Sequence, residues 1–509
     1  MSRGSGRRSR GAAVALLVAG ATALGVSTGF HGHTTIRPAG PDLPVNAGAR
    51  NPADISANNS PALAQNPRRP AELAIANRID SPDYSCALRV SHDHGVHWSS
   101  VKVPIPRGEG HKCYAPDVAF GADGALHMSF VTLRGNGNEP HAAWLATSRD
   151  GARTLSAPSR ALGPLAFQVS LAADPKRPGR LYLSWLQPAQ VGLYLFSGTG
   201  NRIQVVRSDD SGRTWSRPVR ASDTARERVL APTAAVATDG SIYVLYLDVG
   251  DDRLDYEAAH GARGGAPYAG RFTLVLGRSD DGGRTWQESV VDDRVVPTRR
   301  FVAFLPPTPS LAIDDGDGRI YAAFEDGGAG RADVHLWSLS RGARSWTGPT
   351  KVNDTPRHDD TSQYLPQLAV SPDGRLDVAY YDRRADAKDR FNAVSLQSST
   401  DGGRTFTGHV ALSGRRFDSR IGAGSENGLP DLGSRLGVVS EPAGVLAAWA
   451  DTRGGTVGSN KQDIAFARAG VARSSGLASG LRAALRYGGI ALLLGGLALL
   501  LARARPRSA

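Results

Sequence analysis

The sequence predicts an all-β protein, a β-propeller of four-stranded antiparallel blades. One observation is an eight-residue phrase, Ser-x-Asp-x-Gly-x-Thr-Trp with small changes, clearest at 91–98, 208–215, 279–286 and 399–406. The other is a larger unit around each copy, in which turn residues separate four short apolar or alternating runs. Because radial closure protects the edges of such sheets, repeated four-stranded units favour a propeller.

Seven copies of this unit can be followed along the chain. The last position of the phrase recurs at intervals close to sixty residues, with weaker matches at 148–155 and 338–346, and falls at Trp98, Leu155, Trp215, Trp286, Trp346 and Phe406. The seventh copy ends near residue 468 without a fourth strand. We therefore expect seven blades over residues 59–468, with residues 31–58 supplying the missing strand; six blades and an accessory copy are the alternative.

Each residue type in the phrase has a structural task. The aspartates are expected to accept backbone N–H bonds in a tight turn, the glycines to adopt positive φ, and the aromatic ring to pack between strands. The four aspartates of the clear copies are Asp93, Asp210, Asp281 and Asp401.

The two ends of the chain differ from its middle. Residues 1–30 are rich in arginine and then apolar, which predicts a signal peptide; a retained anchor is the alternative. Residues 487–502 are uncharged and flanked by arginines, which predicts one transmembrane helix, with 469–486 as a stalk and 503–509 as a cytoplasmic tail. The expected protein is single-pass in the cell membrane, with an extracellular propeller.

The formal net charge of +12 does not indicate a nucleic-acid partner. Arginines in the two terminal segments, 1–30 and 469–509, supply ten of these charges, and neither segment contains an acidic residue. The middle of the chain therefore lacks the excess of positive charge that a phosphate-binding groove requires.

Cys86 and Cys113 are the only cysteines. Outside the cytoplasm such a pair most often forms a disulfide, which by loop closure would contribute roughly 3–4 kcal/mol. A metal site is the rival interpretation, but it lacks a nearby CxxC or a histidine cluster at ligand spacing. We expect no metal and no cofactor.

Antiparallel topology divides the connections between two faces. The repeated turns and the Asp-Gly turns between first and second strands share one, the turn face. Loops from second to third strand and from blade to blade share the other, the loop face. Unusual polar residues gather there, including Arg78 and Asp80, Glu325, Asp382 and Arg384, Asp451 and Arg453, and, between blades, Tyr114, Asp117 and Tyr364. A ligand site is expected on the loop face, near the axis.

The phrase resembles the Asp-box, or BNR repeat, of sialidases of the neuraminidase superfamily and their relatives, over about residues 60–468. This resemblance implies that Arg78, Arg384 and Arg453 bind a substrate carboxylate, with Asp382 and Asp451 beside them. It further implies Tyr364 as nucleophile, Glu325 as its partner and Asp80 as acid/base. The family's Phe/Tyr-Arg-Ile-Pro signature is absent, and residues 77–82 only faintly match it.

Two functions follow from the resemblance. One is a surface exo-glycosidase of exo-α-sialidase type that removes terminal acidic sugars. The alternative is a non-catalytic propeller that binds glycan or a surface protein, with the membrane contacted through the C-terminal helix. For the residues themselves the alternative roles are structural: Asp382, Asp451, Arg384 and Arg453 as ion pairs at strand ends, and Tyr364 as a packing residue.

Overall fold

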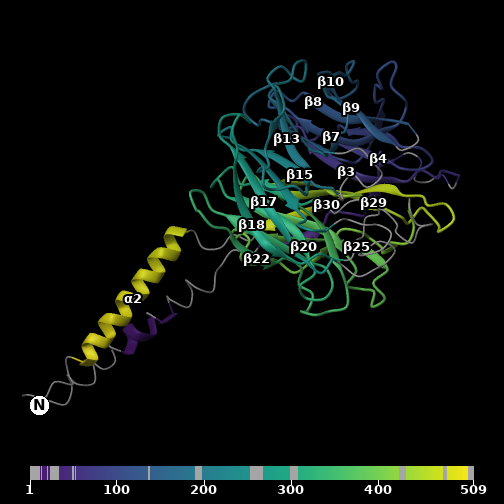
Figure 1. Cartoon of the computed structure of the whole chain (residues 1–509). Coiled ribbons are helices and arrows are strands. Elements are labelled where there is room, and N and C mark those ends of the chain that lie inside the picture. The colour runs from purple at the N-terminus through teal and green to yellow at the C-terminus, as the bar shows by residue number, and fades with distance from the viewer. Residues whose placement is uncertain are drawn as a thin grey trace, which may run out of the picture. The chain divides into compact units, whose positions relative to one another are not determined.

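The computed structural model describes the propeller region almost completely and the chain ends in part. The described residues are 12, 14–19, 21–22, 34–46, 48, 51, 53–135, 138–189, 198–252, 268–298, 308–422, 432–473 and 479–501. Within them the strands form seven antiparallel sheets (Figure 1). The predicted seven-bladed propeller of four-stranded blades is confirmed.

The first six blades follow one another along the chain, each with its strands in sequence order. Blade 1 comprises β3 (Asn58–Gln65), β4 (Leu73–Ile79), β5 (Ser85–Ser91) and β6 (Ser99–Val101). Blade 2 comprises β7 (Cys113–Phe120), β8 (Leu126–Arg134), β9 (Glu139–Ser148) and β10 (Ser159–Leu162). Blade 3 comprises β11 (Phe167–Ala173), β12 (Leu181–Gln187), β13 (Arg202–Ser208) and β14 (Val219–Arg220). Blade 4 comprises β15 (Val229–Val236), β16 (Ile242–Asp248), β17 (Phe272–Ser279) and β18 (Gln287–Val295). Blade 5 comprises β19 (Ser310–Ile313), β20 (Ile320–Asp326), β21 (Asp333–Leu339) and β22 (Thr347–Lys351). Blade 6 comprises β23 (Gln363–Val370), β24 (Leu376–Asp382), β25 (Phe391–Ser399) and β26 (Val410–Ala411), and β27 (Phe417–Asp418) also pairs with β25.

The seventh blade joins the two ends of the propeller sequence. Its sheet has the order β1-β30-β29-β28, and β2 also pairs with β30. The strands are β28 (Gly437–Glu441), β29 (Gly444–Asp451), β30 (Asp463–Arg473), β1 (Thr34–Pro38) and β2 (Leu43–Pro44). Asn46 Nδ2 donates to Asp463 Oδ1 at 2.8 Å, and the Ile464 N–H donates to Asn46 Oδ1 at 2.8 Å. The N-terminal segment is thus tied to β30 and forms the outermost strand of the blade.

The apolar core lies between neighbouring blades. Leu73 and Ile75 of blade 1 pack with Leu446 and Phe466 of blade 7, and each of the four is no more than 1 % exposed. The Trp98 ring, from the repeated phrase, meets Phe466 edge-on with centroids 5.3 Å apart. Since each blade buries its faces against the next, the stability of one blade depends on its neighbours.

The repeated turns share one set of hydrogen bonds. In blade 4 the Asp281 carboxylate accepts bonds from Ser279 Oγ (2.8 Å) and from the N–H groups of Arg284 (2.9 Å) and Thr285 (3.0 Å). The same bonding pattern recurs at Asp93, Asp210 and Asp401. The weaker phrase at 148–155 has it too, because Asp150 accepts bonds from Ser148, Arg153 and Thr154.

The C-terminal helix α2 runs over Ser479–Leu501. Among the described residues, no helix combines the length and the apolar character that a membrane crossing requires. This finding overturns the predicted transmembrane helix at 487–502 and the single-pass cell-membrane localisation. Residues 469–473, predicted as stalk, continue β30. Most of the predicted signal peptide, 1–30, and the predicted tail, 503–509, lie outside the described residues.

Candidate functional site

A central cavity of about 240 Å³ is the site that the fold builds on its axis. Residues from the innermost strands of all seven blades line it, and the charged ones are Arg78, Asp117 and Arg435. The lining positions belong largely to the beginnings of these strands, where the chain arrives from the preceding blade. By antiparallel topology this end of the cavity is on the loop face, as expected from the sequence.

A β-bulge near the start of the innermost strands shapes this end of the cavity. The pairing register shifts between Asn59 and Ala62 in blade 1, between Tyr114 and Asp117 in blade 2, and at the matching places in blades 3, 4 and 6. One residue in each bulge adopts positive φ: Ser60, Ala115, Gln168, Ala231 and Leu365. Bulges redirect side chains and often lie beside functional sites.

Polar side chains next to the bulges link each innermost strand to the following one. Asp117 Oδ2 accepts a bond from the Leu171 N–H at 2.9 Å, and Ser170 Oγ accepts one from the Ala234 N–H at 3.3 Å. The Leu368 N–H donates to Ser310 Oγ at 3.0 Å. These bonds give partners to backbone N–H groups of the innermost strands, so they hold the cavity wall in place.

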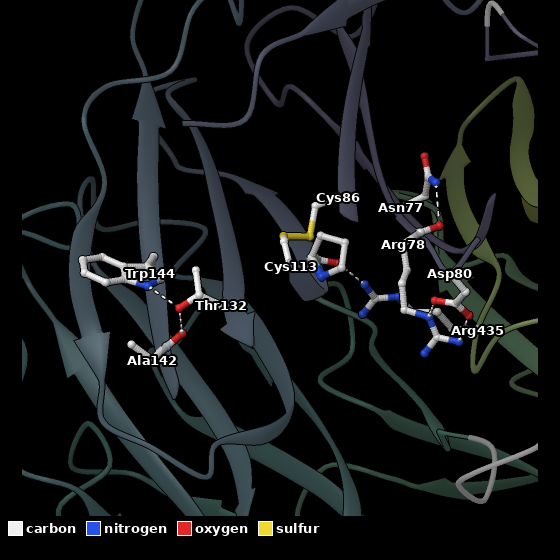
Figure 2. The surroundings of a disulfide bond; sticks show 10 residues. Asn77, Arg78, Asp80, Cys86, Cys113, Thr132, Ala142, Trp144 and Arg435 are labelled. Atoms are coloured by element: carbon white, nitrogen blue, oxygen red, sulfur yellow. Dashed lines mark hydrogen bonds and ion pairs between the residues drawn. A yellow bond between two sulfur atoms is a disulfide. The ribbon is translucent and has the colours of Figure 1, made fainter. Parts of the chain in front are cut away.

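Arg78, the sixth residue of β4, provides one guanidinium group at the cavity. Its Nε lies 2.6 Å from Asp80 Oδ1, and Asn59 Nδ2 donates to Asp80 Oδ2 at 2.9 Å. The guanidinium carbon stands 5.3 Å from the centroid of the Tyr114 ring, within cation–π distance. Figure 2 shows Arg78 and Asp80 beside the disulfide.

The predicted disulfide between Cys86 and Cys113 is present, with Cα atoms 5.5 Å apart. Cys86 pairs with Arg78 across β4 and β5, while Cys113 immediately precedes Tyr114. The bond therefore fastens blade 1 to blade 2 at the point where Arg78 meets Tyr114, and it restrains the distance between these two side chains.

Arg435, which sequence reasoning missed, provides the second guanidinium group. Its Nη1 lies 3.6 Å from Asp117 Oδ2, and it donates to the carbonyl oxygens of Pro116 and Ser60. Arg435 thus connects blade 7 to blades 1 and 2, and Figure 2 shows it near Arg78 and Asp80. The one feature of the sequence that could have indicated Arg435 is its charge, which stands just before the apolar start of β28.

The other two predicted arginines lie elsewhere on the loop face. Arg384 forms ion pairs with Asp382 and Asp354 and borders a separate hollow over blade 6. Arg453 forms ion pairs with Asp451 and with Asp42 from the N-terminal segment, and it borders a third hollow. The three predicted arginines therefore do not line one cavity, and the ion pairs expected under the structural alternative are present.

Tyr364, the predicted nucleophile, is fully buried. Its hydroxyl donates to Asn392 Oδ1 at 2.9 Å and accepts a bond from Arg383 Nη2 at 3.3 Å, and its ring stacks on Tyr381 with centroids 5.4 Å apart. Burial raises the pKa of Tyr364. These contacts pack the Tyr364 ring and hydroxyl within blade 6, away from the central cavity lining.

Glu325, its predicted partner, is also buried and bridges two blades. Its Oε2 accepts a bond from the Leu365 N–H at 2.9 Å, in the bulge of blade 6, and its Oε1 accepts one from Thr298 Oγ1 at 2.7 Å. Burial raises the pKa of Glu325 to about 7, although these bonds and Arg383 act in the opposite direction.

Comparisons with known proteins return solved structures of low similarity to this chain. No protein-family model and no curated protein matches the sequence. A Dyadobacter fermentans protein of unknown function is 14% identical, with a TM-score of 0.47 over 86% of this chain and 99% of its own. A Hadza microbial sialidase is 15% identical, with a TM-score of 0.43 over 78% and 73% of the two chains. An ulvan lyase is 14% identical, with a TM-score of 0.47 over 84% and 98%. Likeness at this level assigns no activity to the chain.

Proposed function

We propose that this protein is a glycan-binding propeller whose central cavity holds one acidic sugar residue. The observation that carries the proposal is the convergence of Arg78 and Arg435, from blades at opposite ends of the sequence, on one cavity lined by residues of all seven blades. Guanidinium groups match carboxylates in shape and charge, and among the described residues each has one acidic neighbour, Asp80 for Arg78 and Asp117 for Arg435. The Arg435–Asp117 contact is long, at 3.6 Å, so this guanidinium group can still bind a carboxylate.

The neutral part of the lining suits a sugar. Ser60, Thr233 and Ser434 offer hydroxyls, and Tyr114 offers an aromatic ring. Gln168 Nε2 is buried and has no hydrogen-bond partner among the described residues, so it can donate to a ligand. A volume of about 240 Å³ is below the range of roughly 300–1,000 Å³ typical of drug-sized ligands. This size favours a single terminal sugar over a chain.

An exo-glycosidase of exo-sialidase type is the second candidate, since the cavity also holds a tyrosine and a carboxylate. Tyr114 and Tyr364 each precede the bulge residue of an innermost strand, but only Tyr114 lines the cavity. We therefore assign the nucleophile, in this candidate, to Tyr114. Asp80 would have to separate from Arg78 and Asn59 to act as the acid, because both now contact its carboxylate.

Calorimetric titration with N-acetylneuraminic acid, glucuronic acid and glucose tests the binding proposal. At least one of the acidic sugars should bind and glucose should not, and Arg435→Gln should weaken binding by about tenfold or more, since a charged hydrogen bond is lost. Arg384→Gln and Arg453→Gln are matched controls and should change affinity by less than about twofold. Binding of glucose as tight as that of the acids, or equal losses in the controls, would contradict the proposal.

Release of a fluorogenic sialoside tests the enzymatic candidate separately. Tyr114→Phe should abolish release, whereas Tyr364→Phe should retain it once the fraction of folded protein is matched. If the wild type binds acidic sugars but releases none, the non-catalytic function stands.

A further inference from the structure

A second hollow on the loop face lies over the outer part of blade 6, and we call it the rim groove. It encloses about 630 Å³ between the end of β24, the start of β25 and the chain that follows β26. Its lining includes Asp382, Arg384, Phe391, His409, Arg415 and Arg416. The rim groove and the central cavity share no lining residue, so they are separate sites on one face.

The charges of the rim groove are unevenly compensated. Asp382 and Asp354 pair with Arg384, and Asp354 also lies 3.5 Å from His409. Arg416 donates to the carbonyl oxygen of Ala385, and no described acidic residue forms an ion pair with it. Arg415, also exposed, forms no hydrogen bond or ion pair with any described residue. Two exposed cationic groups therefore remain available to an anionic ligand.

The shape of the rim groove distinguishes it from a simple charged patch. Phe391 begins β25 at one wall and is 37% exposed, so part of its ring is open to an apolar contact. The volume is within the range of a ligand of several rings. An aromatic surface beside two guanidinium groups suits a sugar ring that carries a sulfate or carboxylate.

The surroundings of the rim groove limit how far a bound polyanion could extend towards blade 7. Arg415 also borders the neighbouring hollow around Arg453. There Asp42, Asp451 and Asp463 offset Arg415, Arg453 and the nearby Lys461, so that hollow offers no excess positive charge to an anion. A polyanion would therefore end at Arg415 or turn away from blade 7.

From these observations we infer that the rim groove binds an acidic polysaccharide, a sugar chain bearing sulfate or carboxylate groups. This inference goes beyond the proposed function, because the central cavity accepts one sugar whereas the rim groove accepts several units of a chain. It does not depend on the cavity, since none of the residues that carry it line the cavity.

Titration of the full chain with dextran sulfate, polygalacturonate, neutral dextran and polyphosphate tests the inference. The wild type should bind at least one acidic polysaccharide and not neutral dextran. The double variant Arg415→Gln/Arg416→Gln should lose about tenfold in affinity or more. The matched control Arg284→Gln/Arg404→Gln removes two exposed arginines from the turn face and should change affinity by less than about twofold.

Phe391→Ala separates a polysaccharide site from a general polyanion site. It should weaken polysaccharide binding about threefold or more while leaving any polyphosphate binding unchanged, because only the sugar uses the ring. Three results would overturn the inference: no binding of either acidic polysaccharide, equal losses in the turn-face control, or no effect of Phe391→Ala. Arg435→Gln should leave binding of the polymer intact, which separates failure here from failure of the cavity.

Discussion

The turn face and the loop face of this propeller differ in how far their side-chain chemistry repeats from blade to blade. On the turn face one set of bonds repeats, with Asp150, Asp210, Asp281 and Asp401 each accepting the same backbone N–H groups. On the loop face corresponding positions carry different chemistry. The sixth residue of the second strand is arginine in blade 1, glutamate in blade 5 and tyrosine in blade 6. Repetition marks the parts that every blade needs, and variation marks where a ligand can be recognised.

Arg78 and Glu325 show how one position serves two purposes. Each is the sixth residue of a seven-residue second strand, directed at the bulge of the following blade. Glu325 is 1% exposed and holds the Leu365 N–H, whereas Arg78 meets the Tyr114 ring and lines the cavity. The fold therefore allows this position either to join blades or to face the axis.

Arg375 and Arg435 give the sharpest test of the comparison, because each arginine bridges blades on a different face. Arg375, beside a turn of blade 6, is 1% exposed, pairs with Asp377 and donates to the carbonyls of Glu441 and Gly444 in blade 7. Arg375→Ala should lower the free energy of unfolding by about 3–5 kcal/mol, since the buried Asp377 carboxylate loses its counter-charge and keeps only the bonds from Ser398 and Ser440. Arg435→Ala should cost about 1 kcal/mol, because its own side chain is 21% exposed and its contact with Asp117 is long at 3.6 Å, yet abolish sugar binding. Chemical denaturation measures both free energies of unfolding, and equal losses would contradict the expected difference between the two arginines.

Glu325→Gln tests, through the pH dependence of the free energy of unfolding, whether the Glu325 carboxyl group joins two blades on the loop face. The pKa of Glu325 is raised to about 7 from an ordinary 4.5, so between these values the folded state binds more protons than the unfolded state. The free energy of unfolding should therefore fall as pH rises from about 4.5 to about 7, by on the order of 2–3 kcal/mol from this group. Glutamine does not titrate and can still accept the Leu365 bond, so the variant should lack this part of the slope. Denaturation at several pH values measures it, and identical slopes would refute the role of Glu325.

The sequence predicted the fold more fully than the site, and the reason is physical. Turn geometry requires particular residues at fixed spacing, so the phrase determined the blades and their two faces. Topology then assigned Arg384 and Arg453 to the correct face but not to a distance from the axis. Both follow the end of a second strand, where local aspartates pair with them, whereas Arg78 lies within its strand and reaches the cavity. Arg435 was missed because it lies in the connection into blade 7, two residues before β28, where no repeated pattern indicates which side chains face the axis.

Asp401→Ala gives the smallest expected effect on sugar binding and tests whether the repeated turns only stabilise the fold. Partial burial would raise the pKa of Asp401, but bonds from Thr405 and Ser399 outweigh it and hold the pKa below its ordinary value. Removing the carboxylate should lower the free energy of unfolding by about 1–2 kcal/mol at pH 7, and by less as the pH falls through the folded pKa, where the wild type also loses the charge. Sugar binding should be unchanged, because Asp401 is on the face opposite the cavity. Calorimetric titration of the folded variant measures this, and a loss of affinity at constant folded fraction would mean that the turn face takes part in recognition.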